Sequence, residues 1–384
     1  MHILVLPKWY PGHRDPQLGD FIRKQMLGVA QAHRVSVVAV SPRHAEGIAE
    51  QELDTDGDHR WELRCHYPPS QAAFGPWRKA VNLLRYWRAG MRGIKRAFAE
   101  RGRPDLTHVH ILVRPALLAW WLQRSRGVPY ILSEQSSEYL DGTWARKGPL
   151  FKAINRKLFR RAARVTAVSS HLGDALKQLG LAQQVAVVPN VVPGMDHVLP
   201  PPGKPGRFMV VADLVDRTKN VSGVLRALGM ARHRGLDLDL DVIGDGPDRP
   251  QLEALAHTLG LNGSVRWHGR IANSAVLERM AHTGAVIVNS NVETFSVVTG
   301  EALALGRPVI ATRCGGPQAF ITAENGLLID VRDDQALAEA MITLTRQAGG
   351  YRPDAIRRTV SERFGPAAIG AAFTAVYTEA LRHG

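Results

Sequence analysis

Two glutamates, Glu293 and Glu301, are separated by seven uncharged residues in the segment ETFSVVTGE. The apolar run AVIVNS (285–290) predicts a strand just before them, and Ser296 is a favourable N-cap for a short helix that Gly-Arg-Pro would end. Glu293 is therefore predicted at the carboxyl end of a strand. Glu301 is predicted inside the helix that follows.

This arrangement suits a ligand that has phosphates in its middle and hydroxyls at both ends. The N–H groups of Ser296, Val297 and Val298 would lack partners within the helix, and with the helix dipole they favour an anion. A carboxylate on each side can accept hydrogen bonds from hydroxyls. The alternative interpretation is that both glutamates are ordinary solvated charges around a short helix.

The elements that must position these residues follow an alternating pattern. Short apolar runs alternate with helical patterns in both halves, which predicts βαβ units and parallel sheets. The predicted strands cover residues 2–6, 35–40, 106–111, 130–133, 165–169, 185–190, 207–213, 238–247, 265–269, 285–290, 308–312 and 326–330. Helical patterns cover about 77–100, 220–234, 250–259 and 334–382.

A stretch rich in Pro and Gly divides the chain. We expect an α/β protein with two doubly wound, Rossmann-like domains facing a central cleft. The predicted divisions are an N-terminal domain at 1–190, a linker at 191–206, a C-terminal domain at 207–365, and a final helix at 366–384 that packs back on the first domain.

All of the excess positive charge lies in the first half. The net charge is +14; residues 1–190 hold 29 Lys and Arg against 15 Asp and Glu, whereas residues 191–384 hold 20 of each. Such a field attracts nucleic acid, an anionic membrane or a phosphorylated substrate. The longest apolar stretch, PALLAWWL (115–122), is far shorter than a membrane span. No secretory signal is predicted, and two distant cysteines, Cys65 and Cys314, fit a reducing cytosol.

The second half resembles glycosyltransferase family 4, whose members are retaining enzymes of the GT-B fold. The matching segments are VIGDGP (242–247), VRWHG (265–269), ETFSVVTGEALALGRPVIATRCGG (293–316) and ENGLLID (324–330). In the first half, WYPGHRDPQLGDF (9–21) is similar to the donor-side loop of a bacterial, polysaccharide-type branch. The resemblance extends over nearly the whole chain.

The resemblance implies a set of donor-binding residues. Glu301 would hold the ribose hydroxyls of a nucleotide sugar, Glu293 would hold hydroxyls of the donor sugar, and Lys219 would bind the diphosphate. A lysine there also agrees with elementary electrostatics, because it neutralises charge that grows as the nucleotide leaves. The other expected donor-binding residues are Thr294, Phe295, Ser296, Val297, Gly19, Arg270, Gly244 and Asn220.

Two positions depart from the family pattern. Asp213 stands where many relatives have an arginine beside the phosphates. Lys219 is then the cation placed to neutralise the phosphates, and Arg217 is its substitute in that role. Gln135, in Glu134-Gln135, stands where the family has its active-site histidine. Glutamine cannot act as a base. A neutral hydrogen-bonding residue would serve if the leaving phosphate takes the proton of the acceptor. We therefore count Gln135 with Glu293 and Lys219 as catalytic candidates.

Acceptor contacts are expected from the first half, at His110, Glu134 and Trp9. His108 and His110 are two residues apart on a predicted strand, so they share a face. No further metal ligands are evident, so we expect no metal and no cofactor other than the donor substrate.

Two basic segments of the first half, 77–103 and 146–164, carry apolar residues at helical spacing. Such helices either lie on an anionic membrane or pack their apolar face on the sheet. Seven of the eight tryptophans also occur in the first half.

We predict a retaining, metal-independent glycosyltransferase that moves a sugar from a nucleotide-diphosphate donor to a glycan or lipid-linked saccharide in cell-surface polysaccharide synthesis. It would be cytoplasmic and peripheral on the inner face of the membrane. The alternative is a nucleotide-sugar epimerase of related architecture. An NAD-dependent oxidoreductase lacks its glycine motif here, and no nucleic-acid-binding motif is present.

Overall fold

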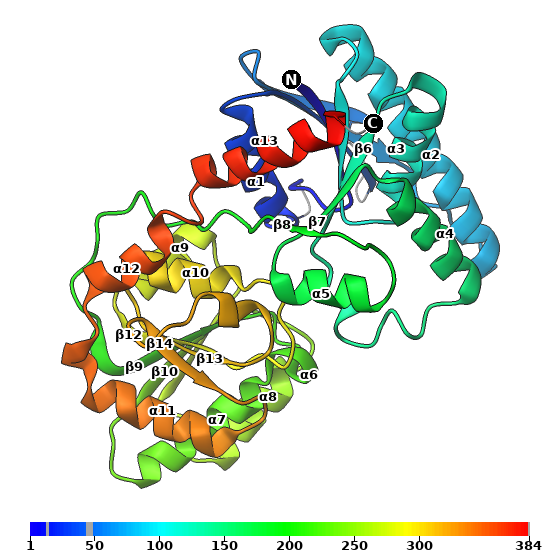
Figure 1. Cartoon of the computed structure of the whole chain (residues 1–384). Helices are drawn as coiled ribbons and strands as arrows, with labels where there is room; N and C mark the ends of the chain where they lie inside the picture. Colours follow the sequence, from blue (N-terminus) through cyan, green and yellow to red (C-terminus); the bar gives the residue numbers. More distant parts are fainter. Residues whose placement is uncertain (13–14, 44–48, 383–384) are drawn as a thin grey trace. The chain divides into compact units, whose positions relative to one another are not determined.

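The computed structural model describes residues 1–12, 15–43 and 49–382, which form two compact units (Figure 1). The first unit comprises Met1–Val191 and Pro366–Gly384, and the second comprises Val192–Gly365. Residues 192–203 contain no helix or strand, and the first strand of the second unit begins at Lys204, within the predicted linker. Cys65 and Cys314 are buried and free.

An eight-stranded sheet forms the centre of the first unit, in the order β3-β4-β2-β1-β5-β6-β7-β8. Its strands are β1 (His2–Pro7), β2 (Arg34–Pro42), β3 (Gln51–Asp56), β4 (Arg60–Tyr67), β5 (Leu106–His110), β6 (Tyr130–Glu134), β7 (Arg164–Ala167) and β8 (Ala186–Val187). Its helices are α1 (Asp20–Ala30), α2 (Gly75–Arg101), α3 (Arg114–Arg126), η1 (Ser137–Tyr139), α4 (Pro149–Arg161), α5 (Ser170–Gln178) and α13 (Pro366–Arg382).

The central strands are buried along their whole length. Every residue of β1, β5 and β6 is buried, as expected for parallel strands covered by helices on both faces. Figure 1 shows α1 and α13 on one side of this sheet and α2, α3 and α4 on the other. The predicted alternation of strand and helix is therefore confirmed for this unit.

One part of the sheet departs from the prediction of parallel strands. The sequence pattern gave no strand between 41 and 76, yet β3 and β4 form an antiparallel hairpin there, with β4 parallel to β2. The strand β3 is a charged edge strand, so it has no apolar run. In β4, polar and apolar residues alternate strictly, and the apolar ones, Trp61, Leu63, Cys65 and Tyr67, are buried. That alternation in the sequence was the signal from which β4 could have been predicted.

The C-terminal helix α13 is an integral part of the first unit. It packs on α1 at a crossing where a Cβ on Gly370 would lie 2.4 Å from the carbonyl oxygen of Gly28, so only glycine fits. Two buried histidines of the unit form hydrogen bonds with it. The His33 ring Nε2 lies 2.8 Å from the Thr374 hydroxyl. The His108 ring Nδ1 lies 2.8 Å from the Tyr377 hydroxyl.

The second unit has a six-stranded parallel sheet in the order β11-β10-β9-β12-β13-β14. Its strands are β9 (Lys204–Val211), β10 (Asp239–Ile243), β11 (Val265–Gly269), β12 (Thr283–Val288), β13 (Val309–Thr312) and β14 (Gly326–Ile329). Its helices are α6 (Asp216–Lys219), α7 (Val221–His233), α8 (Arg249–Thr258), α9 (Asn273–Met280), α10 (Val297–Ala304), η2 (Gly316–Ala319), α11 (Asp334–Arg346), η3 (Ala348–Gly350) and α12 (Pro353–Ser361).

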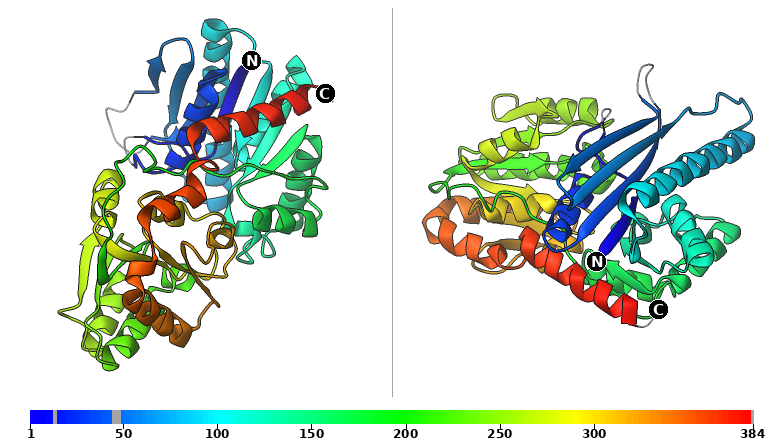
Figure 2. Two further views of the ribbon diagram at one scale, coloured as in Figure 1. Left: turned by 60° about the vertical axis from the view of Figure 1, so that its left-hand side comes forward. Right: turned by 90° about the horizontal axis from the view of Figure 1, so that it is seen from above.

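An apolar core in the second unit joins β9, β10 and β12 to α7, α8 and α11. Each strand of the second unit is followed by a loop at its carboxyl end and a helix, which is the 3-10 helix η2 between β13 and β14. In the first unit the same order holds for β1, β5, β6 and β7, so both units are Rossmann-like (Figure 2). No helix in the described part of the chain is both long enough and apolar enough to span a bilayer.

The Tyr377–His108 hydrogen bond gives a test of how α13 is held. In Tyr377→Phe, the buried His108 Nδ1 loses its partner, so we expect the first unit to lose about 1–2 kcal/mol of unfolding free energy. The measurement is urea unfolding followed by circular dichroism. Tyr351→Phe is the matched control, because the Tyr351 hydroxyl has no hydrogen bond to a described residue. Equal midpoints for the two variants would contradict a contribution from this bond.

Candidate functional site

An ion pair joins two loops at one edge of the second sheet. Lys219 ends α6, which follows β9, and Glu293 lies in the loop after the neighbouring strand β12. The Lys219 Nζ lies 2.5 Å from the Glu293 Oε1, and the Ser290 hydroxyl donates to the same oxygen at 2.8 Å. The two charged side chains are 25% and 15% exposed, so both are accessible to a ligand.

Hydrogen bonds to the loop after β12 fix the position of α6. The Asn291 N–H donates to the Thr218 carbonyl at 2.8 Å, and the Asn291 side chain donates to the Arg217 carbonyl at 2.9 Å. The Asn289 side chain donates to the Asn220 carbonyl at 3.0 Å. Lys219 is therefore held beside Glu293 by the backbone on both sides of it.

Lys219 is positively charged in this setting. Burial lowers the pKa of its ammonium group, but the Glu293 carboxylate outweighs that effect and raises the pKa above its ordinary value. Asn220, the next residue, has a left-handed backbone, and its side-chain Nδ2 is buried with no hydrogen-bond partner among the described residues. The amide of Asn220 therefore has a donor available beside the ion pair.

Glu301 lies in α10 and is only 3% exposed. The side chain of Asn273, the first residue of α9, donates to the Glu301 Oε1 at 2.8 Å. This contact orients the carboxylate, and the sequence analysis missed it. The sequence signal for Asn273 was an Asn three residues after Arg270, at the start of a helical pattern.

The N-terminus of α10 lies between the two glutamates. The Ser296 side chain caps the helix by accepting from the Thr299 N–H, which confirms the predicted N-cap. In the described part of the chain, the N–H groups of Phe295, Ser296, Val297 and Val298 have no acceptor. These groups are free donors at a helix N-terminus, and anion binding by them stays a prediction.

The loop before α10 is fixed by its neighbours. The Glu293 N–H donates to the Cys314 carbonyl at 3.2 Å, and the Gly316 N–H donates to the Glu293 carbonyl at 2.9 Å. The Phe295 ring is buried against Phe320, with ring centres 4.8 Å apart. The Thr294 side chain is half-buried and makes no hydrogen bond to a described residue. Phe295 thus offers its backbone rather than its ring to a ligand.

Two further candidates follow the neighbouring strands β10 and β11. Gly244 has φ +127°, and a Cβ there would lie 1.9 Å from the Ala212 carbonyl oxygen, so close packing of two loops requires glycine. Arg270 pairs with Asp213 at 3.3 Å, and both side chains are more than half exposed. The acid that replaces the expected arginine is therefore paired with a cation. Lys219, Gly244, Arg270 and Glu293 all follow carboxyl ends of parallel strands, so they share one edge of the sheet.

In the first unit, Gln135 is part of a buried polar network at the carboxyl ends of β5 and β6. The Gln135 Nε2 donates to the Gln25 Oε1 at 3.0 Å and lies 3.4 Å from the His110 Nδ1. Gln25 in turn donates to the Pro189 carbonyl at 2.8 Å. The Gln135 Oε1 is buried without a partner among the described residues, so it is an acceptor available to a donor.

His108 and His110 share a buried face of β5, as predicted. Their ring centres are 3.9 Å apart. Burial lowers the pKa of both rings, that of His110 to about 3, so both are neutral at physiological pH. The His110 Nε2 has no partner in the described structure. Among the described residues, no three side chains that could hold a metal ion lie together.

Trp9 and Gly19 lie in one loop region after β1. Gly19 has φ +72°, and a Cβ there would lie 2.5 Å from the Trp9 carbonyl carbon. Packing against Trp9 therefore explains this glycine within the first unit, and its role near the donor phosphates stays a prediction. The half-buried Trp9 ring has the Lys8 ammonium 4.8 Å from its centre. Residues 13 and 14 of this predicted loop lie outside the described residues.

Family models match both units. The glycosyl transferase 4-like domain matches residues 21–191, and the glycosyl transferases group 1 model matches residues 195–359. The chain belongs to the family-4 type of glycosyltransferases. Its two Rossmann-like units form the GT-B fold, as predicted.

Similar proteins support this assignment. The glycosyltransferase is 24% identical to the glycogen synthase of Mycobacterium tuberculosis over 404 residues, which cover 100% of this chain and 95% of that protein. It is 30% identical to the lipopolysaccharide 1,6-galactosyltransferase of Salmonella typhimurium over 208 residues, which cover 52% of this chain and 56% of that protein.

Solved structures show the same fold at low sequence identity. Sucrose-phosphate synthase from Thermosynechococcus elongatus has a TM-score of 0.77 and 18% identity, and the match covers 100% of both chains. The HepE protein of Anabaena, solved in complex with UDP, has a TM-score of 0.69 and 18% identity, and the match covers 98% of this chain and 100% of that one.

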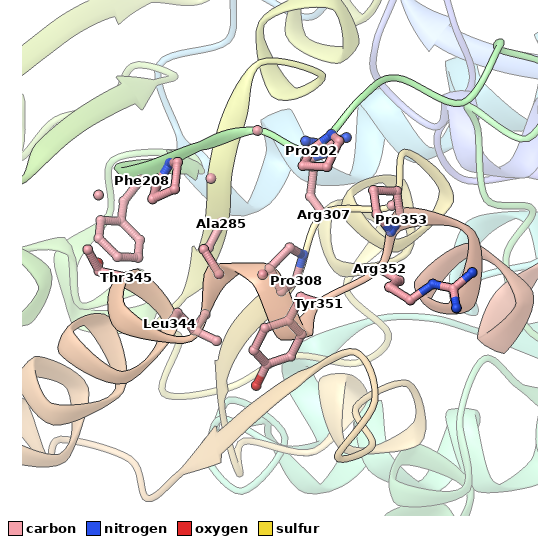
Figure 3. Close-up of a pocket in the computed structure, with 17 residues that line it drawn as sticks. Pro202, Phe208, Ala285, Arg307, Pro308, Leu344, Thr345, Tyr351, Arg352 and Pro353 are labelled. Carbon is pink, nitrogen blue, oxygen red and sulfur yellow. The ribbon is translucent and has the colours of Figure 1, made fainter.

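One apolar pocket of the second unit in this glycosyltransferase lies away from the carboxyl edge of the sheet. A pocket of about 300 Å³ lies beside the amino ends of β9, β12 and β13, where Phe208, Ala285, Pro308 and Tyr351 line it (Figure 3). None of the predicted donor-binding residues lines it. Its position therefore separates it from the ion pair and from the N-terminus of α10.

Glu134 is fully buried in the first unit of this glycosyltransferase. It accepts hydrogen bonds from the Leu112 N–H at 2.8 Å and from the Tyr139 hydroxyl at 3.1 Å. Burial raises its pKa from 4.5 to about 7. A buried acid with such a pKa exchanges its proton near physiological pH, which is the property a proton donor or acceptor needs.

Glu134 makes the stability of the protein depend on pH. Its folded-state pKa is above its unfolded value, so its contribution to unfolding free energy decreases as pH rises from about 4.5 to about 7. Glu134→Gln removes this dependence. We expect the stability of the variant relative to the wild type to increase by about 3 kcal/mol across that interval.

The measurement is urea unfolding at a series of pH values. Glu278→Gln, an exposed carboxylate on α9 with no ion pair to a described residue, is the control and should leave the pH dependence unchanged. Parallel stability curves for Glu134→Gln and the wild type would show that Glu134 does not titrate in this range.

Proposed function

We propose that this glycosyltransferase moves a sugar, with retention of configuration, from a nucleotide-diphosphate sugar to a glycan or lipid-linked saccharide in cell-surface polysaccharide synthesis. The observation that carries the proposal is the Lys219–Glu293 ion pair next to the unpaired N–H groups of α10. One cation and several N–H donors converge at one edge of a parallel sheet, where a diphosphate binds most readily.

Each donor group has a proposed partner. Glu301, oriented by Asn273, accepts hydrogen bonds from the ribose hydroxyls. The N–H groups of Phe295 to Val297 hold the diphosphate, with Thr294 and Ser296 beside them. Glu293 accepts from hydroxyls of the donor sugar through the oxygen that is not bound to Lys219. Gly244, Asn220, Arg270 and Gly19 complete the proposed donor contacts.

Lys219 is proposed to stabilise the departing diphosphate. Its charge is already balanced by Glu293 before the donor binds, so it is held in position rather than free to reorient. As the bond between the sugar and the diphosphate breaks, negative charge grows on the leaving oxygen, and the ammonium stabilises it. No metal ion enters this proposal.

Retention is proposed to follow from reaction on one face of the sugar. The bond from the acceptor oxygen to the anomeric carbon forms as the bond to the leaving phosphate breaks, and the phosphate oxygen takes the acceptor proton. Gln135 then acts as a neutral hydrogen-bonding residue, which agrees with its unpaired Oε1. His110, Glu134 and Trp9 are proposed acceptor contacts.

The names of similar proteins support this proposal. They include a glycogen synthase and a lipopolysaccharide galactosyltransferase, and the HepE structure contains UDP. Uridine diphosphate sugars are therefore the first donors to test. None of the relatives named above favours the alternative of an epimerase. The proposed location is the cytoplasmic side of the cell membrane, where the protein would be peripheral.

Glu301→Ala tests the ribose contact. Loss of the carboxylate should weaken nucleotide binding roughly tenfold to a hundredfold, because ribose hydroxyls lose a charged acceptor. A thermal-shift panel first identifies the nucleotide, and isothermal calorimetry then measures its affinity. Glu278→Ala removes an exposed carboxylate from α9 and is the control. Unchanged affinity in Glu301→Ala would remove the ribose assignment.

Lys219→Ala tests the diphosphate contact. The variant should lose roughly tenfold or more in affinity for the nucleoside diphosphate and little for the nucleoside, since only the former carries the charge that Lys219 neutralises. Calorimetric titrations with both ligands give the comparison. Arg346→Ala, which removes an exposed cation of α11, is the control. Equal losses for the two ligands would rule out the proposed role of Lys219.

A further inference from the structure

Three helices of the first unit, α2, α3 and α4, lie on one side of the sheet (Figure 1), with α3 in contact with both α2 and α4. Large apolar side chains of α2 and α4 are exposed. Trp77 is 63% exposed and Leu84 is 49% exposed on α2. Leu150 is 74% exposed and Ile154 is 42% exposed on α4. We call the side of α2, α3 and α4 that faces away from the sheet the tryptophan face. Isolated exposed apolar residues are common, but a contiguous set on adjacent helices indicates a binding surface.

The packing of α2 explains why its large side chains face outward. The helix contacts the sheet and α3 through small residues. A Cβ on Gly93 would lie 2.7 Å from the Cys65 Sγ of β4, and one on Gly90 would lie 2.6 Å from a Leu118 methyl carbon of α3. Ala89 and Ala97 are buried on the same side. The apolar residues at helical spacing therefore divide: Ile94 is buried, whereas Trp77, Trp87 and Met91 are not.

The tryptophan face contains two grooves that share Trp121. The first has a volume of about 490 Å³ and is lined by Trp87, Leu117, Trp120, Trp121, Arg124, Lys157 and Arg161. The second, of about 390 Å³, lies between α2 and α3 and includes Met91, Phe98, Lys95 and Arg126. Neither lining includes an acidic residue. Aromatic walls with a positive rim are thus the common property of both grooves.

The cations at these grooves are available for a ligand. In the described structure, none of the five lysines and arginines that line the grooves forms an ion pair: Lys95, Arg124, Arg126, Lys157 and Arg161. The Lys157 ammonium lies 4.8 Å from the centre of the Trp120 ring, so it is held over the first groove. By contrast, Arg23, Arg60 and Arg64 in the same unit all pair with the buried Glu62.

We propose that the tryptophan face binds the surface of an anionic phospholipid bilayer, with lipid phosphates in the groove formed by Trp87, Trp120, Arg124, Lys157 and Arg161. The cations match the charge of the headgroups. The indole rings have an apolar body and a polar N–H, which suits the boundary between headgroups and acyl chains. Leu150 and Ile154, on the exposed side of α4, enter the outer acyl region.

Charge and composition favour this occupant over two others. A second copy docking through the same face would place cations against cations, which repel one another. A nucleic acid would be attracted by the charge, but it would leave Leu150, Ile154 and Trp77 exposed to water without a partner. A bilayer satisfies both the charge and the apolar surface. The inference does not depend on the transfer reaction, since binding is measured without donor or acceptor.

The experiment is flotation of the full chain with vesicles of phosphatidylcholine, with and without phosphatidylglycerol. We expect the wild type to float only with the anionic vesicles. The variant R124E/K157E/R161E should lose roughly a hundredfold in its partition coefficient, given the usual contribution of each basic residue near an anionic surface. The control R279E/R346E/R382E changes the net charge equally at exposed helix residues, and it should stay within about threefold of the wild type.

A second variant keeps the test valid if the charge reversal fails to fold. L150S/I154S alters only exposed side chains of α4, so folding should be unaffected, and its residual vesicle binding at high salt should fall. The proposal is overturned if the wild type does not float with anionic vesicles, or if the groove and control triple variants lose binding equally. It is also overturned if L150S/I154S changes the molar mass in solution and leaves flotation unchanged.

Discussion

The direction of the strands is the constraint on which both units depend. In a parallel sheet every strand ends at the same edge, so each loop after a strand contributes to one polar surface, while the strands themselves stay buried and apolar. In the second unit this edge holds Lys219, Gly244, Arg270 and Glu293, which are far apart in the sequence. In the first unit it holds His110 and Gln135. The fold thus brings these side chains to one edge although no single sequence motif contains them.

The cations Lys219 and Arg270 at the proposed donor edge are already paired with acids. Lys219 pairs with Glu293 and Arg270 pairs with Asp213, whereas the Glu301 carboxylate accepts from the neutral amide of Asn273. A bound diphosphate would therefore add negative charge beside cations that already have partners, and the unpaired N–H groups of α10 become important because they carry no counter-charge. Backbone dipoles orient an anion without competing with the existing ion pairs.

Much of the fold could be predicted because local patterns determine it. Apolar runs located the buried strands of both sheets, and Ser296 with the following residues located α10. The hairpin of β3 and β4 was missed because an edge strand such as β3 needs few apolar residues. Asn273 was missed because its importance comes from Glu301, a residue distant in the sequence. The outward-facing residues of α2 could not be identified without the neighbouring sheet, whose close approach to Gly93 sets the orientation of the helix.

The path of the chain has a consequence for its biosynthesis. The helix α13 covers the first sheet, and its Tyr377 and Thr374 satisfy His108 and His33, yet the whole second unit is translated before it. During synthesis, Val192–Gly365 can therefore complete its core while the first unit still lacks a helix. The surfaces of α1 and of the first sheet that α13 covers stay exposed until residues 366–382 leave the ribosome. The first unit therefore completes its folding only after that helix has been translated. Until then it exposes apolar surface, because the helix comes last in the chain.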